Sequence, residues 1–285
     1  MKVIRAKTAG FCMGVSLALR KLDKEVDKGI HDANHRLATF GPIIHNPQVL
    51  AAYEGLGVRC LRDTHGATPG DRIIIRAHGV PQQIEADLKS TGAEIIDATC
   101  PKVKTAQLGI DKQRANGGTL LLFGEEDHPE VRGLLSYAGD DARVFGSLQE
   151  LQELPLNDDT PYFLAAQTTQ DRVAFADIIA WLQQRLGHEV PVLETICDAT
   201  RRRQEEALAI ASKVDAMVVV GGFDSGNTRR LADVARSLGV FTVHVETPDQ
   251  LPADELQKKS VVGLTAGAST PKSLIDAVQV FLESL

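Results

Sequence analysis

Residues 10–15 (GFCMGV), 97–103 (DATCPKV) and 197–204 (CDATRRRQ) each place a cysteine ahead of a similar stretch of sequence. The cysteines are Cys12, Cys100 and Cys197, and their separations are close to one third of the 285 residues of the chain. Self-similarity at a fixed period is the mark of repeated structural units. The spacing therefore predicts a chain built from three similar parts.

Each cysteine is followed by the same succession of patterns. Helical patterns come first, over residues 14–26, 101–113 and 198–214. Short apolar runs that end in glycine come next, over residues 37–41, 119–124 and 216–221. Brief, continuous apolar runs separated by helices are typical of parallel sheets that are buried on both faces. We therefore expect three similar small α/β units with mainly parallel sheets, over residues 1–100, 101–196 and 197–285.

Polar side chains follow the predicted strands at matching positions in each third. They are His45, His78, His128, Thr168, Ser225 and Ser269. His45, His128 and Ser225 each stand four residues past the glycine that ends a strand, and the other three lie in a later strand-to-helix loop. Ligands of such folds bind beyond the carboxyl ends of the strands. If the three units meet about a pseudo-threefold axis, these loops converge on one central cavity.

The three repeated cysteines are candidate metal ligands. Thiolates are soft ligands that suit iron–sulfur clusters, zinc and copper. A structural zinc site normally has four protein ligands, often in close pairs, whereas three thiolates leave one position of a tetrahedral or cubane centre open. The alternative is three buried, inert thiols. The fourth cysteine, Cys60, has no counterpart in the other thirds and is interpreted as a core thiol.

The polar loops offer the groups that an anion and a proton transfer need. Imidazoles, hydroxyls and the amide of Asn227 are donors, and helix N-termini that open after the loops favour phosphate. Glu130 stands two residues past His128. In a pocket its carboxyl could have a raised pKa and deliver protons, although a glutamate at a helix N-terminus can instead serve only the helix dipole.

Composition and charge limit the partners. The chain is 43% hydrophobic and 24% charged, as ordinary globular proteins are, and its formal net charge of −7 gives no support to nucleic acid or an anionic membrane as a partner. No stretch resembles a transmembrane helix or a signal peptide, so we expect a cytoplasmic protein with reduced thiols. The basic run at residues 201–203 is interpreted as a solvated helix face, with a docking site for an acidic redox partner as the alternative.

Nine short motifs, in this order, carry a family resemblance: GFCMGV, IIHNPQV, RAHGV, DATCPKV, DHPEVRG, AQTTQ, CDATRRRQ, SGN and TAGASTP. Together they resemble the 4-hydroxy-3-methylbut-2-enyl diphosphate reductase family. The resemblance runs from about residue 9 to residue 272, which is nearly the whole chain. Any one motif would be weak, but nine in order are specific.

The resemblance implies a trefoil of three α/β units around one [4Fe–4S] cluster per chain, with Cys12, Cys100 and Cys197 as its ligands. It implies that Glu130 delivers protons. It also implies a set of residues that bind the substrate, mainly its diphosphate: His45, His78, His128, Thr168, Ser225, Gly226, Asn227 and Ser269. The implied reaction is a two-electron, two-proton loss of hydroxyl from an allylic diphosphate. A reduced ferredoxin or flavodoxin is the expected electron donor, and a monomer is the expected state, because the trefoil would bury its own core.

Two positions depart from the family pattern. Gly226 stands where a second serine is common and can offer only its backbone N–H, and Arg76 stands where a small serine is frequent. The rival interpretations are another three-unit cluster enzyme, such as quinolinate synthase or the diphthamide-forming cluster enzyme, and a non-catalytic iron–sulfur sensor or zinc-stabilised binding protein. The first two lack the histidine and SGN motifs in these positions, and a sensor has no need of six polar loops and an acid.

Overall fold

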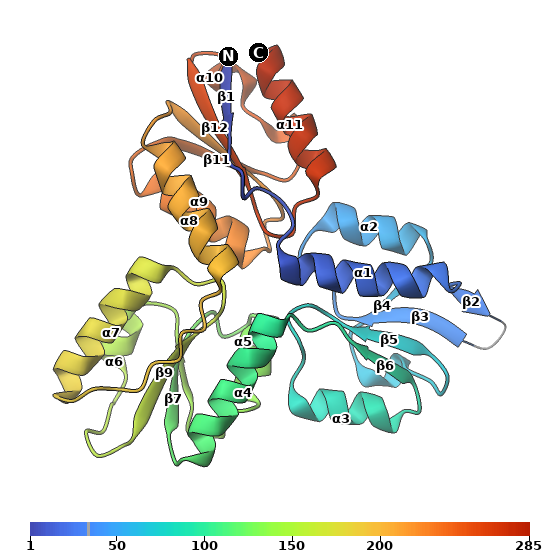
Figure 1. The fold of residues 1–285 in the computed structure, drawn as a ribbon, viewed down its shortest axis with the longest axis vertical. Coiled ribbons are helices and arrows are strands. Elements are labelled where there is room, and N and C mark those ends of the chain that lie inside the picture. Colours follow the sequence, from blue (N-terminus) through green and yellow to red (C-terminus); the bar gives the residue numbers. More distant parts are fainter. Residues whose placement is uncertain (33–34) are drawn as a thin grey trace. The chain divides into compact units, whose positions relative to one another are not determined.

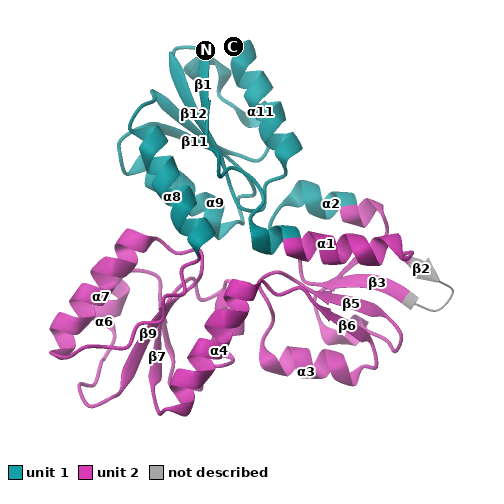
Figure 2. Cartoon of the chain, viewed as in Figure 1, with its two compact units in different colours: residues 1–16, 44–52, 198–285 teal, residues 17–43, 53–197 magenta. Residues whose placement is uncertain are grey.

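The computed structural model describes residues 1–32 and 35–285, and the chain divides into two compact units. Unit 1 contains residues 1–16, 44–52 and 198–285, and unit 2 contains residues 17–43 and 53–197 (Figure 2). No helix within the described residues is both long enough and apolar enough to cross a membrane.

Unit 1 is built on one four-stranded parallel sheet (Figure 1). Its strands run in the order β1 (Lys2–Arg5), β12 (Val261–Ala266), β10 (Ala216–Val220) and β11 (Phe241–Val245). The other elements that lie wholly in this unit are α8 (Asp198–Ala211), α9 (Gly226–Arg236), η2 (Pro248–Gln250), α10 (Ala253–Leu256) and α11 (Lys272–Ser284). Two further helices cross the unit boundary, α1 (Met13–Asp27) and α2 (Pro47–Gly55).

Both faces of this sheet are covered. Val218 and Val220 of β10 pack in one cluster with Ile275 of α11, whereas Met217 packs in a different cluster with Ile210 of α8. Successive strand residues point to opposite faces, so an entirely apolar strand needs a helix on each side. Burying one such side chain stabilises the fold by roughly 1.5–3 kcal/mol. This is why the run AMVVV shows no polar alternation.

Unit 2 contains two sheets. One has the order β2 (His31–Asp32), β3 (His35–Phe40), β5 (Arg72–Ile75) and β6 (Glu94–Asp97), with β4 (Arg59–Leu61) also paired to β3. The other has the order β8 (Arg143–Phe145), β7 (Thr119–Phe123) and β9 (Tyr162–Ala166). The remaining elements are η1 (Thr64–Gly66), α3 (Gln82–Ser90), α4 (Pro101–Ala115), α5 (Pro129–Leu135), α6 (Leu148–Glu153) and α7 (Arg172–Leu186).

The three sheets share one strand pattern, which confirms three small parallel-sheet units. In each, a central strand (β3, β7 or β10) has one neighbour that follows it after a helix (β4, β8 or β11) and a second (β5, β9 or β12) on its other side. The glycine after each central strand donates its N–H to the end of the first neighbour: Gly41 to Leu61, Gly124 to Phe145 and Gly221 to Val245, at 2.8–2.9 Å. Among the described strands, only β2 and β3 pair in antiparallel fashion.

The N-terminal strand is placed differently from the predicted boundaries. Residues Lys2–Arg5, predicted within a unit of residues 1–100, form β1 and pair with β12 over Lys2↔Val261 to Arg5↔Leu264. The corresponding fourth positions in the other sheets are β6 and the bridge between Leu164 and Val192. Each of these segments leads directly to one of the repeated cysteines. The division into three separate domains with the predicted bounds remains a prediction.

Candidate functional site

The three repeated cysteines have the same backbone anchorage. The N–H of Cys12 donates to the carbonyl of Ala268 at 3.1 Å, that of Cys100 to Ala77 at 2.9 Å, and that of Cys197 to Thr168 at 3.1 Å. Each acceptor lies in the loop after β12, β5 or β9, at the carboxyl end of its sheet. The parallel sheets therefore present each thiol at the edge where α/β folds bind ligands.

The chemistry of these cysteines suits a soft metal centre. Cys12, Cys100 and Cys197 are partly exposed thiols outside any disulfide, and each stands immediately before a helix. A helix N-terminus favours negative charge, so it suits a thiolate or an anionic cluster. Cys60 differs: it is an exposed residue of the edge strand β4, so its interpretation as a core thiol is wrong.

The second set of polar loops shares a tight turn, and this turn shifts one predicted equivalence. The N–H of Gly79 bonds to Arg76, that of Gln170 to Gln167 and that of Thr270 to Gly267, at 3.0–3.1 Å. In this register His78 and Ser269 correspond to Thr169. Thr168 corresponds instead to the alanines that anchor Cys12 and Cys100. The sequence alignment of Thr168 with His78 and Ser269 is therefore out by one residue.

In unit 2, Glu130 and Thr168 form a buried pair. Glu130 is the second residue of α5 and is 1% exposed. Its carboxylate accepts the Thr168 N–H at 2.6 Å and the Thr168 hydroxyl at 2.9 Å. A glutamate that only complemented the helix dipole would lie in solvent, so the burial favours a chemical role.

The environment of Glu130 makes it protonatable near neutrality. Burial raises the pKa of Glu130 from 4.5 to about 7, and the two hydrogen bonds from Thr168 partly oppose that rise. A carboxyl group with such a pKa can hold a proton and release it at physiological pH, as a general acid must. The raised pKa therefore agrees with the proton-delivery role predicted from the motif DHPE.

His128 and His78 lie beside this pair in unit 2. His128 is the N-cap of α5, and its Nδ1 accepts the Glu130 N–H at 3.1 Å. An Nδ1 that accepts cannot carry the proton, so the neutral ring presents an Nε2–H donor. The rings of His78 and His128 meet edge to face with centroids 5.3 Å apart. Unit 2 thus brings His78, His128, Glu130 and Thr168 together.

In unit 1, the predicted anion-binding residues gather on two neighbouring loops. Ser225 is the N-cap of α9, Gly226 begins the helix, and Ser225 Oγ accepts the Thr228 N–H at 3.4 Å. Ser269 donates its hydroxyl to the backbone carbonyl of His45 at 2.9 Å. A Cβ on Gly222 would lie 2.9 Å from the same His45 carbonyl, so the segment that carries His45 packs closely on the loop before Ser225.

Asn227 provides the second sign of an anion site in unit 1. It is 5% exposed, and its Nδ2 has no hydrogen-bond partner among the residues that the structure describes. A buried donor left unpaired costs about 1–3 kcal/mol, so such groups usually serve a ligand. The adjoining N-terminus of α9 adds backbone N–H groups that suit a phosphate.

Comparison with known proteins gives the family. A family model described as "LytB protein" matches residues 3–283. The chain belongs to the LytB family. The 4-hydroxy-3-methylbut-2-enyl diphosphate reductase of Nitratidesulfovibrio vulgaris is 74% identical over 285 residues, and that of Oleidesulfovibrio alaskensis is 65% identical over 285 residues; in both cases the match covers 100% of each chain.

Solved structures agree with the LytB assignment. The structure of E-1-hydroxy-2-methyl-but-2-enyl-4-diphosphate reductase from Plasmodium falciparum matches with a TM-score of 0.92 at 26% identity, covering 100% of this chain and 87% of that one. A structure of (E)-4-hydroxy-3-methyl-but-2-enyl diphosphate reductase, described as the terminal enzyme of the non-mevalonate pathway, matches with a TM-score of 0.69 at 36% identity, covering 100% of both chains.

The residues that hold the Cys12 loop of this LytB chain lie outside the motifs found in the sequence. Arg203, predicted on a solvated helix face, is 5% exposed, and its Nη2 donates to the Gly10 carbonyl at 2.6 Å. Glu206, one turn further along α8, accepts the N–H groups of Lys7 and Thr8, both at 2.8 Å. The spacing of Arg203 and Glu206 on one helix face was the available signal, but their partners lie far away in the sequence.

A second missed group holds the loop before Ser225. His244 Nε2 donates to the Gly221 carbonyl at 2.8 Å, and Glu246 accepts the Phe223 N–H at 2.7 Å. Gly221 has φ of +145°, and a Cβ there would lie 2.5 Å from Thr270 Oγ1, so only glycine fits. No sequence pattern marks His244 or Glu246, because each bonds to the segment that follows the neighbouring strand β10.

Arg76, the departure noted in the sequence, fills space in unit 2. Its Nε donates to the Gly79 carbonyl at 3.3 Å. A Cβ on Gly41 would approach Arg76 Nη1 to 2.7 Å, and Gly41 has φ of +71°. Burial lowers the pKa of the Arg76 guanidinium. The Arg76 side chain therefore lies between the loops that follow β3 and β5, and the second of these loops carries His78.

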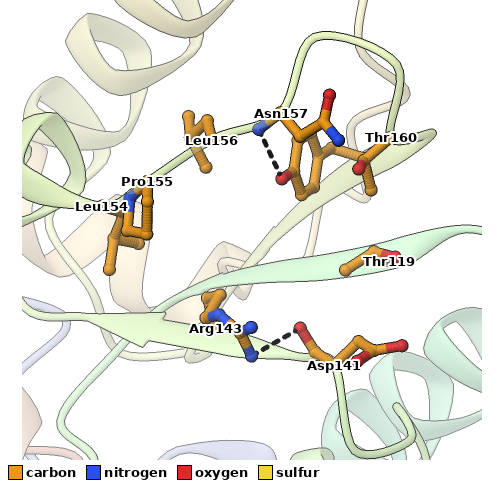
Figure 3. Close-up of a pocket in the computed structure, with 9 residues that line it drawn as sticks. Thr119, Asp141, Arg143, Leu154, Pro155, Leu156, Asn157 and Thr160 are labelled. Atoms are coloured by element: carbon orange, nitrogen blue, oxygen red, sulfur yellow. Dashed lines mark hydrogen bonds between the residues drawn. The ribbon is translucent and has the colours of Figure 1, made fainter.

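A cavity of about 340 Å³ at the opposite end of the β7, β8 and β9 strands contains none of the predicted site residues (Figure 3). It is bordered by the starts of these strands and by the connection that follows α6. Asn157 donates its N–H to the Tyr162 hydroxyl at 3.1 Å there. The last residues of α6, which precede this connection, include the fully buried Leu151.

Proposed function

We propose that this LytB chain is a 4-hydroxy-3-methylbut-2-enyl diphosphate reductase. The observation that carries the proposal is the 74% identity, over the full length of both chains, to a reductase of that name. The substrate (E)-4-hydroxy-3-methylbut-2-enyl diphosphate takes up two electrons and two protons. Its allylic C–O bond breaks, one proton leaves with the oxygen as water, and the second forms a C–H bond. The products are isopentenyl diphosphate and dimethylallyl diphosphate.

LytB proteins are iron–sulfur enzymes, and we assign Cys12, Cys100 and Cys197 as the ligands of one [4Fe–4S] cluster. Three thiols of matching backbone anchorage, each before a helix N-terminus, are the donor set that supports this assignment. When bound, the cluster would supply the electrons and an iron without a protein thiolate as a Lewis acid. Cys60 lies on an exposed edge strand and has no part in this set.

Glu130 is the proposed proton donor to the departing oxygen. It is buried, its pKa is about 7, and Thr168 holds its two carboxylate oxygens through two hydrogen bonds. This fixed orientation directs the acid, because a positioned general acid must lie within hydrogen-bond reach of its target. General acid catalysis of this kind contributes typically about 10²–10⁴-fold to a rate.

The remaining residues are proposed to hold the diphosphate and the allyl chain. Ser225, Asn227 and the Gly226 N–H stand at the N-terminus of α9, where an anion is favoured. The imidazoles of His45, His78 and His128 extend this donor set. Thr168 and Ser269, whose hydroxyls donate to Glu130 and to the His45 carbonyl in this structure, complete the proposed substrate-binding residues. A diphosphate held in one pose limits the motion of the reacting end, which lowers the entropic part of the barrier.

We further propose a ferredoxin or flavodoxin as electron donor, a monomer as the working state, and the cytoplasm as the location. A carrier of this kind gives up one electron at a time, and two such transfers supply the two electrons that the reaction takes up. None of the four cysteines among the described residues is in a disulfide, and thiols stay reduced in the cytoplasm.

The proposal is tested with protein purified without oxygen. Iron and sulfide are counted first, and reduced methyl viologen is then mixed with the hydroxylated allylic diphosphate. We expect about four iron atoms per chain, viologen oxidation that depends on substrate, and both isomeric products. Cys12→Ser, Cys100→Ser and Cys197→Ser should deplete iron, whereas Cys60→Ser, the matched control, should not. A zinc protein, or an iron protein that leaves viologen reduced, would overturn the assignment.

A further inference from the structure

Unit 1 carries a cavity of about 450 Å³ beside the Cys12 loop. The cavity is bordered by the segment of residues 5–11, which connects β1 to the cysteine, and by Lys272 at the start of α11. None of the residues proposed to bind substrate borders it. The cavity therefore belongs to a different surface, whose one link to the proposed chemistry is the Cys12 loop.

Positive charge gathers around this cavity. Lys7 is exposed on the loop, and Arg5 and Lys272 both pair with Asp276, at 2.6 and 2.7 Å. Two cations thus share one carboxylate. The nearby Glu206 carboxylate is occupied by backbone N–H groups of the loop. On a chain whose formal net charge is −7, the three cations Arg5, Lys7 and Lys272 offer an acidic partner local attraction.

Exposed apolar side chains flank the thiol next to this charge. Phe11 is 37% exposed and Met13 is 55% exposed, on either side of Cys12. An apolar centre with a charged rim is the usual anatomy of a protein interface, and encounters between electron-transfer proteins use small interfaces. The Cys12 loop is also anchored by the hydrogen bond from Arg203 to the Gly10 carbonyl, so it presents a defined surface.

We propose that this surface, formed by Arg5, Lys7, Phe11, Met13 and Lys272, is the docking site of a small acidic protein that carries one electron. The inference deepens the proposed function and rests on it. The carrier would be oxidised by one electron in each encounter, and two encounters would supply the two electrons of one turnover. Opposite charges would steer the encounter and raise its rate, more strongly at low salt.

The test measures the rate of two iron-loaded proteins, the wild type and the double variant Lys7→Glu/Lys272→Glu, with each of two reductants. One reductant is a small acidic [2Fe–2S] ferredoxin, and the other is reduced methyl viologen, which needs no protein docking. We expect the variant to require a roughly tenfold higher ferredoxin concentration for half-maximal rate at low salt. Its iron content and its viologen-driven rate should stay within about twofold of the wild type, because neither lysine is in the proposed substrate site.

The control is Lys258→Glu/Lys259→Glu, a charge reversal of equal size at the opposite end of β12. We expect this control to behave as the wild type with both reductants. Raising the salt concentration should slow the ferredoxin-driven wild type and bring it toward the double variant. Equal ferredoxin dependence in the wild type and the Lys7/Lys272 variant would overturn the docking site while the viologen rate upheld the reductase. Failure of the wild type with both reductants would remove the reductase and the docking site together.

Discussion

Thr168 joins the acid of unit 2 to a cysteine of the same unit. Its N–H and hydroxyl both bond to Glu130, and its carbonyl accepts the N–H of Cys197 at 3.1 Å. A single residue after β9 therefore fixes the orientation of the proposed proton donor and the start of the loop that carries a proposed ligand. The arrangement couples the position of the acid to that of the thiol through one residue.

Thr168→Val should move the pH dependence of turnover. The Thr168 hydroxyl stabilises the ionised form of Glu130, so its loss should raise the pKa of Glu130 above about 7. A general acid is active while protonated, and activity should therefore persist to higher pH in the variant. The measurement is the viologen-driven rate from pH 6 to 9, with iron counted in each sample. Thr169→Val is the control, and an unshifted profile for Thr168→Val would contradict the proposed acid.

Glu130→Gln should remove most turnover and change how stability depends on pH. The folded pKa of Glu130 lies above 4.5, so the stabilising contribution of the protonated form is complete below pH 4.5 and is lost as pH rises through about 7. A neutral amide avoids that loss, which amounts to roughly 3 kcal/mol at most. We expect the melting temperature of Glu130→Gln to exceed that of the wild type at pH 8 by more than it does at pH 5.5.

The same variant separates chemistry from binding. Its iron content and substrate affinity should match the wild type, while the rate should fall by about 10²-fold or more. Turnover near the wild-type rate would show that Glu130 is not the acid. A melting difference that is the same at both pH values would show that the carboxyl group is not perturbed as its burial indicates.

Arg203→Met should loosen the Cys12 loop. The variant keeps a long side chain in α8 but leaves the Gly10 carbonyl without its donor, which costs about 1–3 kcal/mol. We expect lower iron content after purification and faster loss of iron to a chelator. Arg202→Met, at an exposed position of the same helix, is the control. Equal rates of iron loss in the two variants would show that the loop holds its shape without Arg203.

Asn227→Ala should weaken substrate binding more than catalysis. The variant removes the buried Nδ2 that lacks a partner among the described residues, so the free protein loses no hydrogen bond of that group. The KM should rise roughly tenfold, in line with the loss of a hydrogen bond to a charged group. The matched control is Asn157→Ala in the cavity of unit 2, and an unchanged KM would place the diphosphate elsewhere.

The repeated elements could be predicted because local patterns specify them. Helices expected over residues 14–26 and 101–113 are α1 (Met13–Asp27) and α4 (Pro101–Ala115), and residues 37–40 of the run LATFG lie in β3. These segments are long or wholly apolar, so their burial follows from composition alone. The correspondence of Thr169, rather than Thr168, with His78 and Ser269 could not be predicted, because only the hydrogen bonds of the turn define that register.

Other features depend on contacts between distant residues, which no local pattern reveals. β1 has four residues and pairs with a strand near the far end of the chain, so its sheet could not be read from its own sequence. Cys60 lies in the three-residue edge strand β4, where an apolar neighbourhood does not ensure burial. Arg203 is buried, and its hydrogen bond goes to the carbonyl of Gly10, far earlier in the chain.

The pairing of β1 with β12 has a consequence for synthesis on the ribosome. After its own synthesis β1 must wait for β12, since Lys2 pairs with Val261. Both sheets of residues 17–197 are fully translated before that partner exists. Nascent chains therefore carry an unpaired β1 until β12 has been synthesised, and a message truncated before residue 261 leaves the backbone of β1 open to misassembly.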